Sequence, residues 1–152
     1  MYIAIQEYND CIEAAFEKVF FTRPKRVEYV PNSRISDDDC VAATLKFFGP
    51  FYGEVVLAVN KQMRAPVTEF VLDAFGAPHD TPEDIMYTEV LNIFSGNMIT
   101  ELTRRNLAMN ISPPNPVGEL SLQNIQVEMI LITTENDLEI KFYLIMGNEP
   151  ND

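Results

Sequence analysis

Two polar residues, Glu89 and Asn92, are candidates for chemistry because they lie three apart in a segment with helical spacing. Residues three apart in an α-helix are neighbours on one face. A carboxylate can pair with a cation, and an amide can both donate a hydrogen bond to a water molecule and accept one from it. The pattern Glu-x-x-Asn is expected about once by chance in a chain of this size. The spacing alone therefore also fits a solvated carboxylate beside a solvated amide.

The segment from 82 to about 105 is predicted to form the helix that positions this pair. Thr81 can cap its start, and Pro82 suits the first helical position, where no backbone N–H is needed. At about 100° per residue, the apolar side chains fall on one side, which is the expected core face. This apolar stripe consists of Tyr87, Val90, Leu91, Phe94, Met98 and Leu102.

The opposite side of this helix has an unusual composition for a face in contact with water. It carries Ile85, Glu89, Asn92 and Gly96, with Ile99 toward its edge. A glycine in the middle of a helix destabilises it by about 1 kcal/mol relative to alanine. The missing side chain would let another backbone or a ligand approach closely. Together with the two isoleucines, the glycine indicates a partner-binding surface.

The other segments predict an α+β domain. Helices are expected over about 5–21 and 62–75, and Gly76 is placed to close the second one. Strands are expected at about 27–30, 40–48, 53–60, 107–111, 121–133 and 138–146. This order fits long helices packed on an antiparallel sheet, with a loose internal duplication of one helix and three strands. No domain boundary is visible, so residues 1–152 are predicted to form a single domain.

The predicted strand at 121–133 alternates between apolar and polar residues. Its odd-numbered positions from Ile125 to Leu131 are apolar, whereas Asn124, Gln126 and Glu128 are polar. Such alternation is typical of an antiparallel strand that is buried on one face and solvated on the other. We therefore expect the odd-numbered side chains to face the core.

Composition and charge exclude several functional classes. The chain has 152 residues and a net charge of −12, which argues against binding to nucleic acid or to an anionic membrane. It shows neither a signal peptide nor a membrane-spanning segment, so we expect a cytoplasmic protein with Cys11 and Cys40 reduced. A single histidine argues against a histidine-based metal site or triad. The acidic run 37–39 is predicted to be solvated rather than to bind a cation.

Two stretches of the chain resemble one protein family. The stretch 89–96 (EVLNIFSG) and the later stretch 110–114 (NISPP) resemble the CheC/CheX/FliY family of bacterial chemotaxis phosphatases, and the CheX branch in particular. The family motif is Glu-x-x-Asn on a long helix, followed some twenty-odd residues later by a proline, where this chain has Pro113 and Pro114. Further likeness in the hairpin and second helix extends the resemblance over about 45–146.

The resemblance implies an activity and a partner. Members of the family remove the phosphoryl group from the aspartyl phosphate of a response regulator such as CheY. Glu89 would pair with the regulator's lysine, and Asn92 would orient the attacking water. The resemblance also implies a homodimer. The chain would need no cofactor or metal ligand of its own, because a divalent metal would belong to the regulator.

One departure and two alternatives accompany the resemblance. The family commonly has Asp or Ser four residues before the glutamate, and this chain has Ile85, which leaves the choice of partner open. The first helix offers only Glu13-Ala-Ala-Phe16, without an amide, so one site is expected.

A non-catalytic binding module of the same fold is the first alternative. The second is a hotdog-type enzyme for small molecules with Glu89 as general base, which requires an enclosed apolar pocket beside Glu89.

Overall fold

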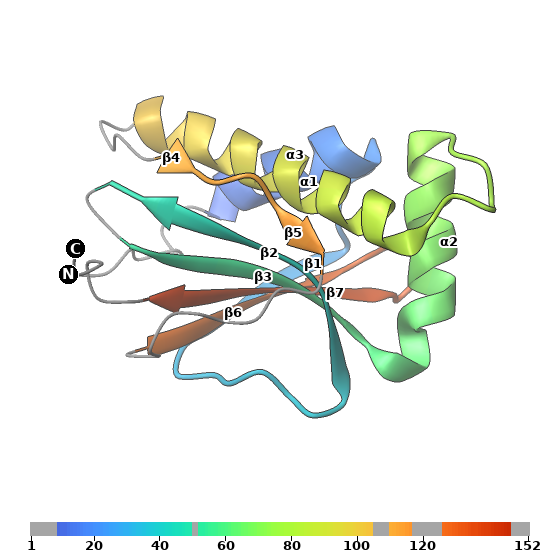
Figure 1. Cartoon of the computed structure of the whole chain (residues 1–152), viewed down its shortest axis with the longest axis horizontal. Helices are drawn as coiled ribbons and strands as arrows, with labels where there is room; N and C mark the ends of the chain where they lie inside the picture. Colours follow the sequence, from blue (N-terminus) through green and yellow to red (C-terminus); the bar gives the residue numbers. More distant parts are fainter. Residues whose placement is uncertain (1–8, 50–51, 105–109, 117–125, 147–152) are drawn as a thin grey trace.

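An antiparallel sheet carries its first and last helices on one face, and the middle helix stands at one end of the sheet (Figure 1). The computed structural model describes residues 9–49, 52–104, 110–116 and 126–146. The helices are α1 (Asn9–Phe20), the 3-10 turn η2 (Lys61–Met63), α2 (Arg64–Phe75) and α3 (Glu83–Arg104). The strands are β1 (Arg26–Val30), β2 (Asp39–Phe48), β3 (Gly53–Asn60), β4 (Asn110–Ile111), β5 (Asn115–Pro116), β6 (Gln126–Thr133) and β7 (Glu139–Met146).

These elements confirm the predicted α+β fold, with one addition. Each predicted helix and strand has a counterpart in the structure, whereas the two-residue strand β5 is not predicted. Gly76 closes α2 in the left-handed conformation, with φ of 62°, as the sequence predicts. A turn at 134–137 joins β6 to β7, and in it the N–H of Asp137 donates to the carbonyl oxygen of Thr134 at 2.9 Å.

The strand order shows the internal duplication directly. The sheet runs β1-β6-β7-β3-β2-β4, and β5 also pairs with β2. Exchanging β1 with β4, β2 with β6 and β3 with β7 gives the same order read backwards. The helices α1 and α3 each begin one of these halves, and they pack against each other on the same side of the sheet (Figure 1).

The main core lies between the helices and the sheet. Its centre includes Phe94 of α3 stacked on Phe142 of β7, with ring centroids 4.0 Å apart. Phe16 and Leu57 are also fully buried there. The predicted apolar stripe of α3 is confirmed for Tyr87, Val90, Leu91, Phe94 and Met98, which are all at most 5% exposed. The side chain of Leu102 lies outside the described part of the chain.

The prediction for β6 is wrong about which face is buried. The even-numbered residues Ile130 and Ile132 enter the main core, and both are fully buried. Val127, at an odd-numbered position, instead joins a second apolar cluster on the other face of the sheet. Ile35, from the segment between β1 and β2, packs against that cluster. Because Ile35 packs on the second face, buried apolar side chains occur on both faces of β6, and the alternation of polar and apolar residues does not mark the core side.

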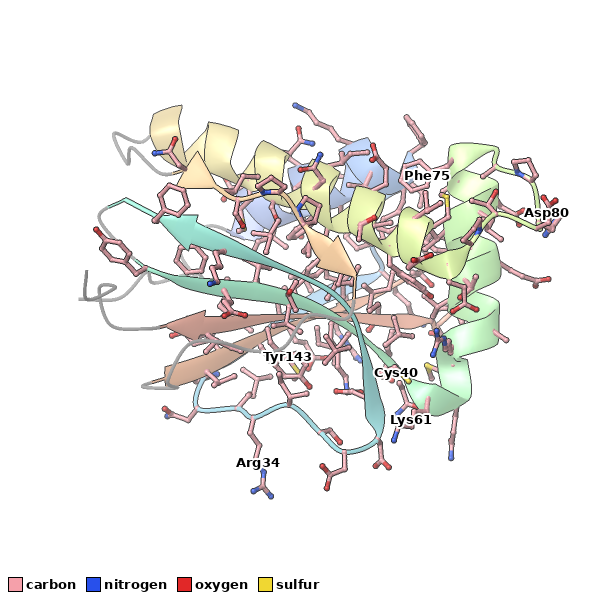
Figure 2. The ribbon with its side chains drawn as sticks, in the orientation of Figure 1. Arg34, Cys40, Lys61, Phe75, Asp80 and Tyr143 are labelled. Carbon is pink, nitrogen blue, oxygen red and sulfur yellow. The ribbon has the colours of Figure 1, made fainter. Side chains whose placement is uncertain are left out.

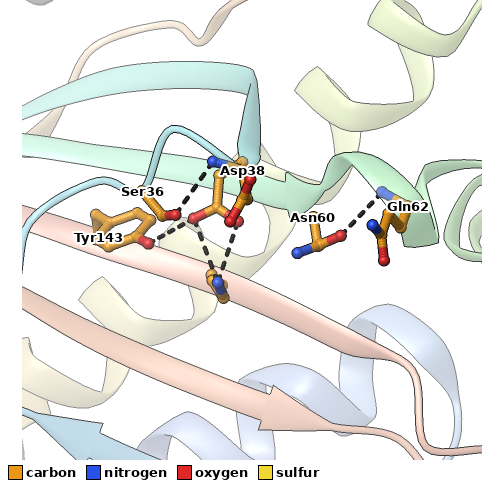
Figure 3. A network of polar contacts seen from close by, with 7 residues as sticks. Ser36, Asp38, Asn60, Gln62 and Tyr143 are labelled. Carbon is orange, nitrogen blue, oxygen red and sulfur yellow. Dashed lines mark hydrogen bonds and ion pairs between the residues drawn. The ribbon is translucent and has the colours of Figure 1, made fainter.

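The acidic run 37–39 also differs from the prediction, because one of its members is buried. The side chain of Asp39 is fully buried and accepts a hydrogen bond from the Tyr143 hydroxyl at 2.6 Å. Lys141 pairs with the same carboxylate, with Nζ 3.1 Å from Oδ1. Burial and the adjacent Asp39 raise the pKa of Tyr143. Figure 3 shows this network, which attaches the start of β2 to β7 across the sheet.

The other two acidic residues of the run, Asp37 and Asp38, are exposed as predicted. In Figure 2, Tyr143 lies between the sheet and the segment that covers it, while Arg34 projects away from the protein. Within the described ranges, no group of three or more His, Cys, Asp or Glu side chains could hold a metal ion. No helix in those ranges is long and apolar enough to cross a membrane.

Candidate active site

The long helix α3 is anchored at its beginning by its own acidic residues and by α2. Asp84 accepts a hydrogen bond from the N–H of Ile85 at 3.0 Å. Glu83 forms an ion pair with Arg64 at the start of α2, with Nη2 2.6 Å from Oε2. The hydrogen bond to Glu83 raises the pKa of Arg64. Carboxylates in the first turn also complement the positive end of the helix dipole.

One turn further along, a buried tyrosine joins the same two helices. The hydroxyl groups of Tyr87 and Thr68 lie 2.8 Å apart. Burial raises the pKa of Tyr87. The inner side of α3 packs on α1 and β2, and this packing holds the residues of its outer face in position.

The outer face of α3 presents the candidate residues in one line. Glu89 and Asn92 are exposed, Ile85 is 57% exposed, and Gly96 is partly exposed. At about 1.5 Å rise per residue, the line from Ile85 to Gly96 is roughly 16 Å long. Ile99 lies one turn further along α3, but its side chain is outside the described part of the chain. The sequence thus predicts the exposed face correctly, and the roles of its residues stay predictions.

The polar side chains of α3 divide into those engaged within the chain and those that are not. The Thr88 hydroxyl donates to the carbonyl oxygens of Asp84 and Ile85, each at 2.9 Å. The Asn97 amide donates to the carbonyl oxygen of Ile93 at 2.8 Å. Neither Glu89 nor Asn92, by contrast, forms a side-chain hydrogen bond or ion pair with another described residue. Their polar groups are therefore available to a partner.

Gly96 has no packing reason within the described structure. A Cβ atom added at Gly96 would meet no other atom within 4 Å. At Gly53 in β3, by contrast, an added Cβ would collide with the carbonyl oxygen of Ile145. Gly53 is thus required by the fold of this chain, whereas Gly96 leaves open space on the outer face.

The downstream proline segment runs beside α3. Strands β4 and β5 pair with β2 and also contact α3, so the chain between them, with Pro113 and Pro114, lies along the helix (Figure 1). Pro113 is exposed and Pro114 is half-buried. The Ser112 N–H donates to the carbonyl oxygen of Lys46, and the Lys46 N–H donates to the Ser112 hydroxyl, each at 2.8 Å. Sequence reasoning misses this attachment, because it joins residues 66 apart.

The hotdog-type alternative needs an enclosed apolar pocket beside Glu89, and the geometry of α3 does not support it. Glu89 is exposed on an outward-facing helix. Two surface hollows of the described structure lie elsewhere, at residues 34–38 and near the end of α1. An exposed carboxylate suits recognition of another macromolecule better than catalysis on an enclosed small molecule.

Comparison with known proteins identifies the fold. No protein-family model and no curated protein sequence matches the chain. The crystal structure of the chemotaxis protein CheX from Desulfovibrio desulfuricans is 15% identical with a TM-score of 0.69, and the alignment covers 94% of this chain and 98% of that one. A chain of the CheX-CheY-BeF3-Mg²⁺ complex from Borrelia burgdorferi is 13% identical with a TM-score of 0.71, covering 97% and 100%.

A third solved structure has a similar fold with a lower TM-score. FliY of Thermotoga maritima is 16% identical with a TM-score of 0.58, and the alignment covers 97% of this chain and 92% of FliY. At these identities the likeness concerns the fold, and it extends over nearly the whole of each chain. The chain therefore has the fold of the CheX- and CheC-like chemotaxis proteins.

Proposed function

We propose that this protein is a phosphatase that hydrolyses the aspartyl phosphate of a CheY-like response regulator. The observation that carries the proposal is that Glu89 and Asn92 are exposed side by side on α3 without side-chain partners among the described residues. The shared fold supports it, since one protein of this fold is a CheX in complex with CheY, BeF3 and Mg²⁺. A partner protein also fits the exposed position of the pair, which is not enclosed by its own chain.

The chemistry assigns a separate role to each side chain. Water attacks the phosphorus atom in line with the acyl oxygen, the bond from phosphorus to that oxygen breaks, and the aspartate carboxylate and inorganic phosphate are released. An acyl phosphate is already activated, so positioning supplies most of the acceleration. The Asn92 amide can hold the water without placing a negative charge near the phosphoryl group. Glu89 pairs with a lysine of the regulator and fixes the orientation of the two proteins.

Phosphate release tests this proposal. Phosphorylated CheY-like regulators are mixed with the protein or with the Asn92→Ala variant, and the loss of phosphate is compared with spontaneous decay. The proposal predicts faster loss with the unmodified protein and a return to about the spontaneous rate with Asn92→Ala. Binding without acceleration would instead identify a non-catalytic docking module, and acceleration that survives Asn92→Ala would overturn the role of Asn92.

We also propose that the protein acts as a homodimer and takes any divalent metal from the regulator. The homodimer rests on the resemblance to CheX and is tested by sedimentation equilibrium of the full chain. The metal assignment predicts that phosphate release depends on metal bound to the regulator. Titrating this protein alone with Mg²⁺ should then give no saturable binding.

A further inference from the structure

Ile85 is an exposed apolar side chain at a position where the helix itself does not favour one. The large hydrophobic side chains exposed among the described residues are Phe21, Phe48 and Ile85. Ile85 is the third residue of α3, where acidic residues are favoured by the helix dipole, and Glu83 and Asp84 before it follow that preference. Isoleucine also has a lower helix propensity than the unbranched residues. Neither helix stability nor packing within the described structure explains it.

The position of Ile85 relative to the candidate site is fixed. It lies one turn before Glu89 on the same face, so the two side chains are neighbours, with their backbone positions about 6 Å apart along the helix. The backbone around Ile85 is held at both ends, because Asp84 accepts from its N–H and Thr88 donates to its carbonyl oxygen. A partner that pairs with Glu89 must therefore also cover or approach Ile85.

Resting on the proposed function, we propose that Ile85 determines which regulators this protein accepts. Its contact is an apolar side chain of the regulator, next to the lysine that Glu89 binds. The charge around Ile85 supports an apolar contact at this position. A carboxylate at position 85 would add its negative charge to those of Asp84 and Glu89 and would favour a second cation on the partner. Isoleucine cannot pair with a cation, so a second cation of the regulator placed against it would lose its water without gaining an ion pair. An apolar pair here also excludes water from the adjacent ion pair.

Binding measurements with three variants test this inference. The probes are CheY-type receiver domains held in the active state by BeF3 and Mg²⁺. Their Kd is measured for the unmodified protein, for Ile85→Asp, for Ile85→Val and for Phe21→Ser. Ile85→Asp should raise the Kd of the preferred receiver about tenfold or more, whereas Ile85→Val should change it by less than about threefold. Phe21→Ser removes a comparable exposed hydrophobe, 76% exposed and at the end of α1, and should leave the Kd unchanged.

A second readout separates a docking role from damage to the chemistry. At saturating regulator, Ile85→Asp should release phosphate at the unmodified rate, so that KM rises while kcat is retained. The variant should fold normally, because aspartate suits the third position of a helix, and its thermal melting curve checks this.

The outcomes distinguish this inference from the proposed function. If Ile85→Asp binds every receiver as the unmodified protein does, or if Phe21→Ser weakens binding equally, the inference is wrong even when the phosphatase activity stands. If no activated receiver binds at all, the inference is also wrong. If the unmodified protein binds a receiver without accelerating phosphate loss, the phosphatase proposal fails, and the Kd values of the variants still decide the role of Ile85.

Discussion

The helices α1 and α3 begin topologically equivalent halves of the sheet, yet they present different outer faces. On α3, Glu89 and Asn92 are both exposed. On α1, Glu13 is exposed but Phe16, three residues later, is fully buried in the core. Two residues three apart therefore share an exposed face on α3 but not on α1. The spacing of two residues therefore marks a candidate site only when the core face of the helix that carries them is known.

The acidic residues of the two helices also differ in what they contact. Near the end of α1, Glu17 forms an ion pair with Arg23, with Oε1 2.7 Å from Nε. Glu89 of α3 has no such partner among the described residues. A carboxylate that is already paired within its own chain must break that pair to bind a partner's lysine. Glu13, which precedes Phe16 as Glu89 precedes Asn92, has no side-chain partner among the described residues either. The burial of Phe16, rather than the pairing of Glu17, therefore favours α3 over α1 as the proposed binding helix.

Placing an amide in α1 should not create a second site. Phe16→Asn puts the family spacing into α1 after Glu13, but the amide would replace a fully buried ring that contacts Phe20. We expect the variant to lose about 3–5 kcal/mol of unfolding free energy, because a large apolar side chain is removed and a polar group is buried. Urea denaturation measures the loss. An increase in phosphate release per folded molecule would contradict the assignment of a single site.

Removing the carboxylate of α3 should affect binding and not stability. Glu89→Gln keeps the shape of the side chain but cannot form an ion pair with a lysine. The Kd for an activated receiver should rise about tenfold to a hundredfold, as for a charge pair at the centre of an interface. The unfolding free energy should stay within about 0.5 kcal/mol, since the side chain is exposed. The control is Glu13→Gln on α1, which should change neither quantity.

Filling the open position on α3 should improve folding and impair function. Gly96→Ala should stabilise the protein by up to about 1 kcal/mol, because alanine favours the helix and the added Cβ meets no other atom within 4 Å. If the regulator's backbone approaches α3 there, the same methyl group should weaken binding. Thermal unfolding and receiver titration of one variant measure both effects. A more stable protein with unchanged affinity would show that Gly96 lies outside the interface.

The smallest effect is expected at the anchor of α3. Arg64→Ala removes the ion pair to Glu83, whose two side chains are half exposed to water. Exposed pairs contribute about 0.2–1 kcal/mol, so the loss of stability should stay within that range and diminish with added salt. Chemical denaturation at two salt concentrations tests this. A loss of several kcal/mol would mean that the ion pair, rather than the buried stripe, determines the position of α3.

The sequence predicts those features of the fold that depend on local periodicity. The apolar stripe of α3 and the exposed positions of Glu89 and Asn92 follow from one helical repeat. The buried face of β6 cannot be predicted in this way, because Ile35 packs on the outer face from about ninety residues away in the chain. The burial of Asp39 likewise depends on Tyr143, far along the chain. The short strand β5 has too few residues to show a period.

The sequence predicts where the residues of the candidate site lie, but not which hydrogen bonds the side chains of α3 form. Sequence spacing places Glu89 and Asn92 on one face. It cannot show that Thr88 and Asn97 bond to their own helix while Glu89 and Asn92 do not, because that depends on side-chain conformations. This difference between neighbouring polar residues is what the structure adds to the argument for function.

Two amides of α3 allow a direct test of the role proposed for Asn92. Asn92 faces outward without a partner in the described structure, whereas Asn97 donates to the carbonyl oxygen of Ile93. Phosphate loss from a phosphorylated regulator is followed with saturating amounts of the unmodified protein, Asn92→Ala or Asn97→Ala. The role proposed for Asn92 predicts a fall of about 10²–10³-fold in the rate for Asn92→Ala and nearly full activity for Asn97→Ala. Equal activity of the two variants would contradict it.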